Sequence, residues 1–284
     1  MFEMIFENKN GKQLNFGAGT PFTIKEFTGL NPPKATINTN ETALIDGGRF
    51  NSSKLQMRSM NIAFAIETDA AVNRLKVYEV VQSKMPLRVY YKSETLDIFI
   101  DGYVDDVDFS YFSMKNICTV SVLCPFPYFK AAQEAINELY AIIPMFHFPF
   151  HGTAQKDIVF GVIDVYTDET VVNRGAVETG LTFELYAKNS IKNPKVIDYQ
   201  TAEFFQIDIQ MQEGDLITVN TMQGNRTVKL LRHAVETNIF NLMDKNSTWL
   251  QLGMNNSTFV YEVDEGVLTD LVVTIKHYDL YEGV

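Results

Sequence analysis

The sequence predicts a mainly β protein of two domains, with one helix in the first domain. Its 284 residues exceed a typical single core and suit two domains of roughly 150 residues each. Short runs of alternating apolar and polar residues fill most of the chain, whereas only one segment has the period of a helix. With 46% hydrophobic residues, including 21 Phe and 13 Tyr, the chain has ample apolar surface to bury in two cores.

The first domain is expected over residues 1–135. Ile62, Phe64 and Ile66 alternate with smaller residues and should share one face of a long strand. Gly102 interrupts an alternating run and suggests a β-bulge. The expected strands of this domain lie at residues 2–6, 21–27, 54–68, 86–93, 96–112 and 118–124.

One helix is predicted over residues 69–84. Asp69 is a favourable N-cap residue, and Lys84 followed by Pro86 closes the segment. The helix is expected to bury an apolar stripe made of Ala71, Leu75, Tyr78 and Val81.

Residues 38–54 are rich in Asn, Gly, Ser and Thr, which predicts an extended loop or a protruding hairpin. This segment is longer than most loops inside compact domains. A functional arm that contacts a partner and an ordinary surface loop are both compatible with its composition.

The strand at 118–124 stops abruptly at Pro125 and Pro127, which cannot continue a sheet ladder. Phe126, Tyr128 and Phe129 surround the stop. Cys118 and Cys124, which are the chain's two cysteines, lie six positions apart and should be separated by roughly 20 Å along one strand. They are therefore expected as buried free thiols of a reducing compartment.

The boundary between the domains is expected in a Pro-punctuated aromatic linker at residues 136–156, followed by the second domain at 157–284. Clean alternation at Leu181, Phe183 and Leu185, with turn residues at short intervals, predicts an antiparallel sandwich. An arrangement in which the last residues pack back on the first domain stays open. The expected turns are at Gly175, Asn193-Pro194, Gly214-Asp215, Gly224-Asn225, Asn255-Asn256 and Gly266.

The sequence predicts no catalytic, cofactor-binding or metal-binding residue. His147 and His151 have the i, i+4 spacing of a helical zinc pair, but Pro149 between them prevents a helix. No P-loop, GxSxG, GxGxxG or CxxC pattern occurs. The acidic residues Asp105, Asp106 and Asp108 suit a solvated strand better than an acid pair of a glycosidase.

The net charge of −11 disfavours tight binding to a phosphate backbone. The charge is uneven, since residues 1–138 hold 14 Lys and Arg against 16 Asp and Glu, and the remainder hold 10 against 19. No secretory signal is expected, and the longest uncharged run, 139–155, is too short to cross a membrane.

Several stretches, in order, resemble the distal tail proteins of long-tailed bacteriophages and prophages, the siphophage tail-component family. The similarity covers nearly the whole chain, although Phe126 stands where the family pattern leads us to expect a small or acidic residue. The stretches that carry it are LNPPKATI (30–37), DGGRF (46–50), MRSMNIAFAI (57–66), CTVSVLCPFPYF (118–129), residues 171–196, 214–230, 249–263 and the terminal YEGV (281–284).

The resemblance implies a split-barrel-like ring domain followed by a galectin-like β-sandwich, in a structural virion protein without enzymatic activity. It implies a homohexameric ring at the distal end of the tail, which joins the tail tube to the tail-tip hub or baseplate and lets DNA pass through its channel. Expected partners are other copies of the chain, the tail-tube protein, the tail-tip hub or tail-associated protein and a receptor-binding protein, with no specific DNA binding and no membrane. The expected location is the virion tail, assembled in the host bacterial cytoplasm.

This interpretation gives roles to three groups of residues. Pro125, Pro127, Tyr128 and Phe129 would hold the chain at the interdomain junction, and the acidic residues at 105–108 are candidates for the channel wall. The candidates for contact between subunits or with the tail tube are Asn40, Asp46, Gly47, Gly48, Arg49 and Phe50.

Two other functions stay open. The sandwich could be a carbohydrate-binding module that recognises host cell-wall saccharide, which would require exposed aromatic residues around Trp249. An enzyme acting on the bacterial wall would require Asp105, Asp106 and Asp108 to meet in a cleft.

Overall fold

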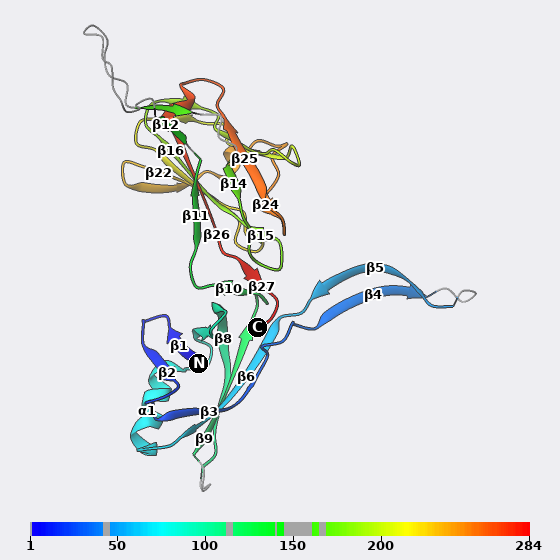
Figure 1. Cartoon of the computed structure of the whole chain (residues 1–284), viewed down its shortest axis with the longest axis vertical. Coiled ribbons are helices and arrows are strands. Elements are labelled where there is room, and N and C mark those ends of the chain that lie inside the picture. The colour runs from blue at the N-terminus through cyan, green and yellow to red at the C-terminus, as the bar shows by residue number, and fades with distance from the viewer. Residues whose placement is uncertain (1, 42–45, 112–115, 140, 145–160, 165–168) are drawn as a thin grey trace. The chain divides into compact units, whose positions relative to one another are not determined.

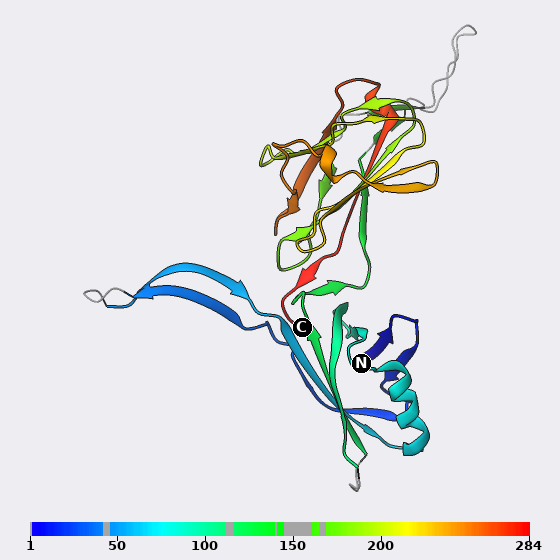
Figure 2. The same cartoon turned by 180° about the vertical axis from the view of Figure 1, so that it is seen from behind.

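A computed structural model describes residues 2–41, 46–111, 116–139, 141–144, 161–164 and 169–284. The chain forms two compact units, one of Met1–Ala132 with Leu280–Val284 and one of Gln133–Asp279 (Figure 1, and from behind in Figure 2). The described residues form a mainly β protein with one α-helix, which confirms the predicted fold class. The division differs from the expected boundaries in that residues 133–135 lie in the second unit and the last five residues lie in the first.

The first unit is built on a nine-stranded antiparallel sheet. Seven strands follow one another in the order β2-β1-β7-β8-β9-β6-β3, and a short strand, β10, pairs with both β8 and β27. The strands are β1 (Glu3–Asn8), β2 (Gln13–Phe16), β3 (Phe22–Thr28), β6 (Arg58–Ile66), β7 (Pro86–Lys92), β8 (Asp97–Phe109), β9 (Ile117–Cys124), β10 (Phe129–Ala131) and β27 (Leu280–Tyr281).

Period-2 alternation directs one face of this sheet into the core. Ile62, Phe64 and Ile66 are almost fully buried on that face, as predicted. The expected strand at 54–68 is wrong as a single element, because the chain leaves the ladder at Gln56 and Met57 before β6 begins. Phe16 contacts both Phe22 and Phe64, with ring centroids 5.9 and 4.9 Å away, so three strands share one aromatic cluster.

The helix α1 (Ala70–Val80) covers part of this core, but its orientation differs from the prediction. It buries Asn73, Val77 and Val80, whereas Leu75 and Tyr78 of the predicted stripe are exposed. The Asn73 side chain is tolerated inside because its Nδ2 donates a 2.7 Å hydrogen bond to the Thr68 carbonyl.

The expected cap of this helix is also wrong. Asp69 has a left-handed backbone (φ 44°, ψ 50°), and its side chain makes no capping hydrogen bond. The helix stops at Val80, four residues before the predicted end, because Val81 is extended. Val81 is itself buried, which explains its place in the apolar pattern.

A β-bulge lies in β8 at Asp105, three residues after the position predicted from Gly102. The pairing with β9 shifts between Val104 and Asp106, so Asp105 is the extra residue. This insertion turns Asp106 and Asp108 to the solvent face of the sheet. Gly102 is required for another reason, since a Cβ there would lie 2.6 Å from Val122 Cγ1.

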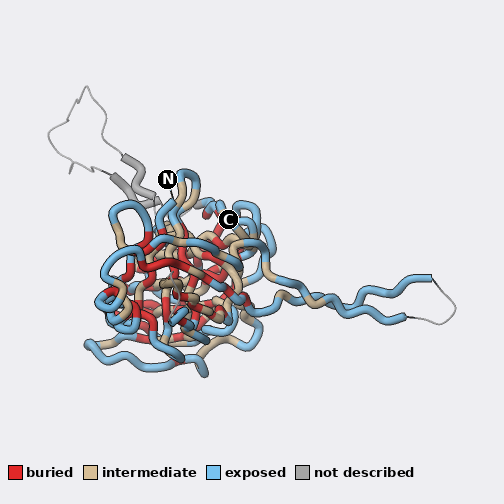
Figure 3. Tube along the Cα trace, turned by 90° about the horizontal axis from the view of Figure 1, so that it is seen from below, coloured by how far each residue is buried: buried red, intermediate tan, exposed pale blue. Residues whose placement is uncertain are grey.

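Strands β4 (Ala35–Glu41) and β5 (Gly48–Leu55) form a hairpin that pairs with no other described strand. We call this hairpin the arm. It leaves the nine-stranded sheet before β6 and is drawn almost wholly in the exposed colour of Figure 3. Of the two structures expected for residues 38–54, the described residues adopt the protruding hairpin.

The second unit contains two main sheets, in the orders β11-β26-β16-β21-β22-β23 and β14-β25-β18-β19, and three short pairs, β12-β13, β15-β24 and β17-β20. Its strands are β11 (Ala135–Glu138), β12 (Ala141–Pro144), β13 (Gly161–Asp164), β14 (Glu169–Val171), β15 (Thr179–Gly180), β16 (Thr182–Ala187), β17 (Ile191–Lys192), β18 (Lys195–Asp198), β19 (Phe204–Gln206), β20 (Gln210–Met211), β21 (Leu216–Asn220), β22 (Thr227–Arg232), β23 (Val235–Asn238), β24 (Gln251–Leu252), β25 (Ser257–Glu262) and β26 (Leu271–His277). Two short 3-10 helices, Phe240–Leu242 and Leu268–Asp270, complete it.

The two main sheets share one core. Phe183 of β16 and Phe259 of β25 meet with ring centroids 6.0 Å apart at an interplanar angle of 74°. Leu181, Phe183 and Leu185 are each 1% exposed, which confirms the predicted alternation. The predicted turns all lie outside strands, and residues of the expected linker at 145–156 lie outside the described residues.

Candidate functional site

The six candidate contact residues lie at the distal end of the arm. Asn40 pairs with Arg49 across the hairpin, and Phe50 faces Thr39. Gly47 has a φ of 89°, which only glycine adopts without strain, so it supports the turn before β5. The described members, Asn40, Asp46, Gly47, Gly48, Arg49 and Phe50, are all exposed.

The pairing register gives the arm two different faces. Ala35, Ile37 and Thr39 of β4 lie on one face, opposite Leu55, Ser53 and Phe50 of β5. Thr36, Asn38, Lys54 and Ser52 lie on the other face, which is polar. Ile37 is 63% exposed and Phe50 is 61% exposed, so the apolar face has no cover from the described part of the chain.

A buried cation, Arg58, lies beside residues 125–129, which the sequence assigned to the interdomain junction and which belong to the first unit. Its Nε donates to the Pro127 carbonyl at 2.8 Å, and its Nη2 donates to the Glu282 carbonyl at 2.6 Å. Its Nη1 donates to the Asn31 carbonyl at 2.7 Å and also to the Gly29 carbonyl. The residue as a whole is only 2% exposed. We call Arg58 and these four carbonyls the Arg58 cage.

The cage connects three distant segments of the first unit. Residues 29–31 follow β3, residues 127–129 follow β9, and residue 282 follows β27. The Arg58 guanidinium also lies 4.5 Å from the centroid of the fully buried Phe129 ring. Burial lowers the pKa of Arg58, which the nearby Cys124 and Glu282 oppose.

The junction residues therefore have distinct positions. Pro125 and Pro127 follow the last residue of β9, and Phe129 begins β10 under the Arg58 guanidinium. Phe126 and Tyr128 form an edge-to-face pair with centroids 5.3 Å apart. The two prolines end β9, and the chain then turns and continues as β10 of the same sheet.

Sequence reasoning missed Arg58, although the sequence holds a signal for it. Arg58 precedes Met60, Ile62 and Phe64 at intervals of two, so it occupies a core position of an apolar strand. A charged residue at such a position requires several hydrogen-bond partners. The pattern could have predicted a buried cation, but not which carbonyls surround it.

The acidic residues Asp105, Asp106 and Asp108 do not form a cleft. All three are exposed, and Asp106 and Asp108 face solvent opposite Ser121 and Thr119 of β9. The acid pair that a wall-degrading enzyme would need is therefore not formed by these residues. They remain candidates for a surface that repels phosphate.

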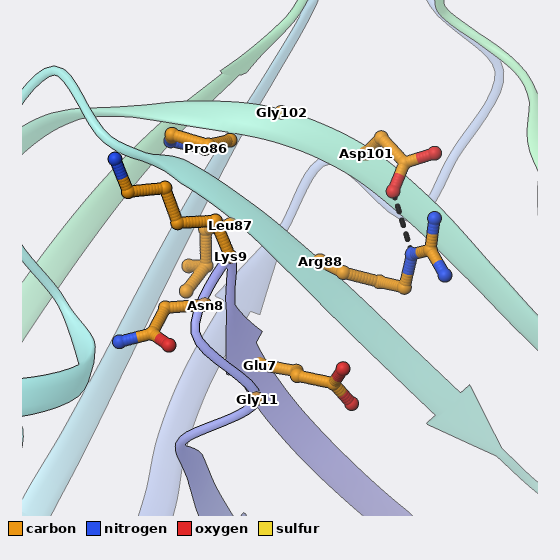
Figure 4. Close-up of a pocket in the computed structure, with 9 residues that line it drawn as sticks. All are labelled: Glu7, Asn8, Lys9, Gly11, Pro86, Leu87, Arg88, Asp101 and Gly102. Atoms are coloured by element: carbon orange, nitrogen blue, oxygen red, sulfur yellow. Dashed lines mark hydrogen bonds and ion pairs between the residues drawn. The ribbon is translucent and has the colours of Figure 1, made fainter.

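A hollow of about 290 Å³ lies where the end of β1 and the start of β7 meet Asp101 and Gly102 of β8 (Figure 4). Asp101 at its edge accepts hydrogen bonds from Arg88 Nε at 2.7 Å and Lys130 Nζ at 3.1 Å. Burial alone would raise the pKa of Asp101, but these two cations lower it below its usual value. Because two cations keep this carboxylate ionised, it serves to hold Arg88 and Lys130 in place and is a poor group for proton transfer.

Trp249 is part of an aromatic group in the second unit and is half-buried. The Phe240 ring stacks on it at 5.7 Å and 28°, and the Arg226 guanidinium lies 5.2 Å from its centroid. Phe205 contacts it from the core at 5.2 Å. Of these neighbours, Phe240 is itself exposed, so one exposed aromatic residue lies beside Trp249 as the carbohydrate-binding hypothesis requires.

Cys118 and Cys124 are free and fully buried, as predicted. Burial raises the pKa of both thiols to about 12. His147 and His151 lie outside the described residues. Within the described ranges, no group of three or more His, Cys, Asp and Glu side chains could hold a metal ion, and no helix is long and apolar enough to span a membrane.

Comparison with known proteins agrees with the resemblance seen in the sequence. Residues 174–278 match the family model described as siphovirus-type tail component, C-terminal domain. The match confirms the resemblance to the siphophage tail-component family for this part of the second unit. No curated protein sequence matches the chain.

Solved structures share its fold. The crystal structure of the Dit protein of phage SPP1, titled a paradigm of hub adsorption apparatus in phages that infect Gram-positive hosts, superposes with a TM-score of 0.67 at 13% identity over 98% of both chains. A chain of the phage p2 baseplate in its activated conformation with Ca superposes with a TM-score of 0.56 at 12% identity over 100% of both chains. A second phage p2 baseplate, with Sr, gives a TM-score of 0.51 at 12% identity over 98% of both chains. The fold of the whole chain is thus that of phage hub and baseplate proteins.

Proposed function

We propose that this protein is a structural component of the distal end of a long phage tail, where copies of it form a hexameric ring. The ring joins the tail tube to the tail-tip hub or baseplate. The observation that carries the proposal is the agreement between the family match over residues 174–278 and the fold likeness to the SPP1 hub protein across 98% of both chains.

The arm supports a role in assembly. An isolated two-stranded hairpin is marginally stable in water, and this one exposes Ile37 and Phe50 on one face. Such a hairpin gains most stability when another surface covers its apolar side. We therefore assign the arm to contact with a neighbouring subunit or with the tail tube.

The charges support a channel through which DNA passes without binding. Residues Asp105, Asp106 and Asp108 are exposed on the solvent face of β8 and repel a phosphate backbone. We propose that this face lines the channel. The expected partners remain the tail-tube protein, the tail-tip hub or tail-associated protein and a receptor-binding protein, on a virion tail assembled in the host cytoplasm.

Deletion of residues 40–52 tests the proposal. This variant removes the distal arm and leaves every strand of the nine-stranded sheet intact. We expect rings of the wild-type chain in electron micrographs and a folded monomer of the deletion variant, with unchanged thermal unfolding of the second unit. Intact rings after the deletion would refute the role of the arm.

A matched control replaces residues 42–45, which lie outside both strands of the arm, by Gly-Ser-Gly-Ser and keeps the length of the chain. This control should still assemble. If it fails to assemble like the deletion variant, residues 42–45 and not the paired strands carry the contact.

A further inference from the structure

Helix α1 has two apolar faces. One face, with Asn73, Val77 and Val80, is buried in the first unit. The opposite face carries Val72, Leu75 and Tyr78, which are 58%, 64% and 39% exposed. At about 100° per residue these three residues span about 120° of the helix surface, on the side away from the core. A helix that is apolar on both sides is typical of one that is covered on both sides.

Tyr111 extends this outer face. The Tyr78 and Tyr111 hydroxyls are 2.8 Å apart, and the Tyr111 side chain is also largely exposed. The Arg74 guanidinium lies between the two elements, 5.0 Å from the Tyr111 ring centroid. We call these four exposed residues, Val72, Leu75, Tyr78 and Tyr111, the outer helix face. The carboxylate of Glu79, which lies on the same side of the helix, pairs with Lys12 Nζ at 2.8 Å.

We propose that the outer helix face of one copy receives the apolar face of the arm from a neighbouring copy of the chain. This inference rests on the proposed function, because it names the contact by which the subunits of the ring associate. Both surfaces remain exposed within one chain, so they do not cover each other there. Two different complementary patches on one chain produce a head-to-tail contact, which closes into a ring or extends as a filament.

The apolar row of the arm is longer than the outer helix face, so the arm can cover that face along its whole length. The apolar residues of the arm run from Ala35 to Thr39, which is about 13 Å at strand rise. The outer helix face runs from Val72 to Tyr78, which is about 9 Å at helical rise. A short helix can therefore lie along the arm with Ile37 and Phe50 against its side chains.

The charges beside the two surfaces are also complementary. Glu41 continues the apolar row of β4 towards the tip and forms no ion pair with any described residue. Lys76 beside the outer helix face forms none either within the described ranges, and the buried Arg74 Nε has no hydrogen-bond partner there. Glu41 of the arm and Lys76 of the helix thus carry opposite charges that this contact would bring together, whereas Glu79 of the helix is already paired with Lys12.

Cysteine cross-linking tests this contact directly. The variant Phe50→Cys/Leu75→Cys places one thiol on each surface, and the two natural cysteines are fully buried and unreactive. At high protein concentration with mild oxidant, we expect a ladder of covalent multimers on a non-reducing gel. Each single variant should give dimers at most. A control pair, Phe50→Cys/Met254→Cys, uses an equally exposed position of the second unit and should give no ladder.

Electron microscopy of the same cross-linked samples separates this inference from the proposed function. Rings together with a ladder support both. Rings without a ladder overturn the helix contact and leave the ring intact, whereas a ladder with open filaments supports the contact and overturns the ring. Neither ladder nor rings overturns both.

Discussion

The Arg58 guanidinium donates a 2.6 Å hydrogen bond to the main-chain carbonyl of Glu282, a residue 224 positions later in the sequence. Three more carbonyls, from Gly29, Asn31 and Pro127, accept from the same side chain. One buried cation thus fixes the last residues of the chain to the strand that follows the arm. The strand that follows the arm and the C-terminal residues are therefore held together by a single side chain.

Replacing Arg58 with Ala should destabilise the first unit by about 3 kcal/mol, because four buried carbonyls lose their donor. Urea unfolding followed by far-UV circular dichroism measures this change. The lone tryptophan, Trp249, lies in the second unit, so its fluorescence transition should stay in place. Arg58→Lys keeps the charge but loses the planar guanidinium. The stability of its first unit should lie between that of wild type and that of Arg58→Ala. An unchanged midpoint for Arg58→Ala would contradict the cage.

Removing residues 280–284 should also destabilise only the first unit, by about 2–4 kcal/mol. The truncation removes β27, with its pairs Phe129–Tyr281 and Lys130–Leu280, and exposes the site of the buried Leu280. Combining it with Arg58→Ala should cost less than the sum of the two changes, because both remove the same contact. Strict additivity in this double-mutant cycle would show that the tail and Arg58 act independently.

Gly102→Ala should destabilise the sheet by about 1–3 kcal/mol through overpacking. A Cβ at this position would lie 2.6 Å from Val122 Cγ1 and 2.8 Å from Cys124 Sγ. Gly253→Ala is the matched control, since nothing lies within 4 Å of a Cβ there. The control should change the free energy of unfolding by less than about 0.5 kcal/mol. Equal effects of the two substitutions would disprove the close packing at Gly102.

The Asp215–Arg232 pair should make the second unit sensitive to acid. Burial raises the pKa of the Asp215 carboxyl, but hydrogen bonds from Arg232 and the Gln212 main chain outweigh this and lower the pKa overall. The Arg232 Nη2 and the Gln212 N–H lie 2.5 and 2.8 Å from Asp215 Oδ2. Because the folded pKa is below the unfolded value of about 3.9, the stabilisation is present above about pH 4 and is lost as the pH falls through the folded pKa.

Asp215→Asn tests this pH dependence. Trp249 fluorescence in urea, measured from about pH 7 to about pH 2.5, should show a variant that is about 2 kcal/mol less stable than wild type at neutral pH. The gap should shrink below about pH 4 as the wild-type carboxylate becomes protonated. A gap that stays constant across this range would mean that the charge of Asp215 contributes nothing.

Much of the sheet structure could be predicted because it depends on local alternation. An alternating set of apolar residues can be buried together only on one face of a strand. Two such sets are Leu181, Phe183 and Leu185, and Ile62, Phe64 and Ile66. The stop of β9 at Pro125 follows from the missing N–H of proline. The composition of residues 38–54 indicated a segment outside the core, but it did not decide between an extended loop and the protruding hairpin.

Other features depend on partners far apart in the sequence. The predicted stripe was wrong because α1 is apolar on both sides, and periodicity alone cannot decide which side faces the sheet. Asn73 can lie on the buried side because its side chain donates a hydrogen bond to the Thr68 carbonyl. The bulge at Asp105 depends on the register with β9, which no local pattern fixes. The acceptors of Arg58 come from three segments that only the fold brings together.

The central claim is that this chain is a ring-forming structural protein of a phage tail. Light scattering at several protein concentrations, combined with electron microscopy of the same samples, tests it most directly. The account predicts a mass that rises with concentration toward that of a hexamer, together with closed rings that have a central hole. A constant monomer mass and isolated particles at every concentration would contradict it.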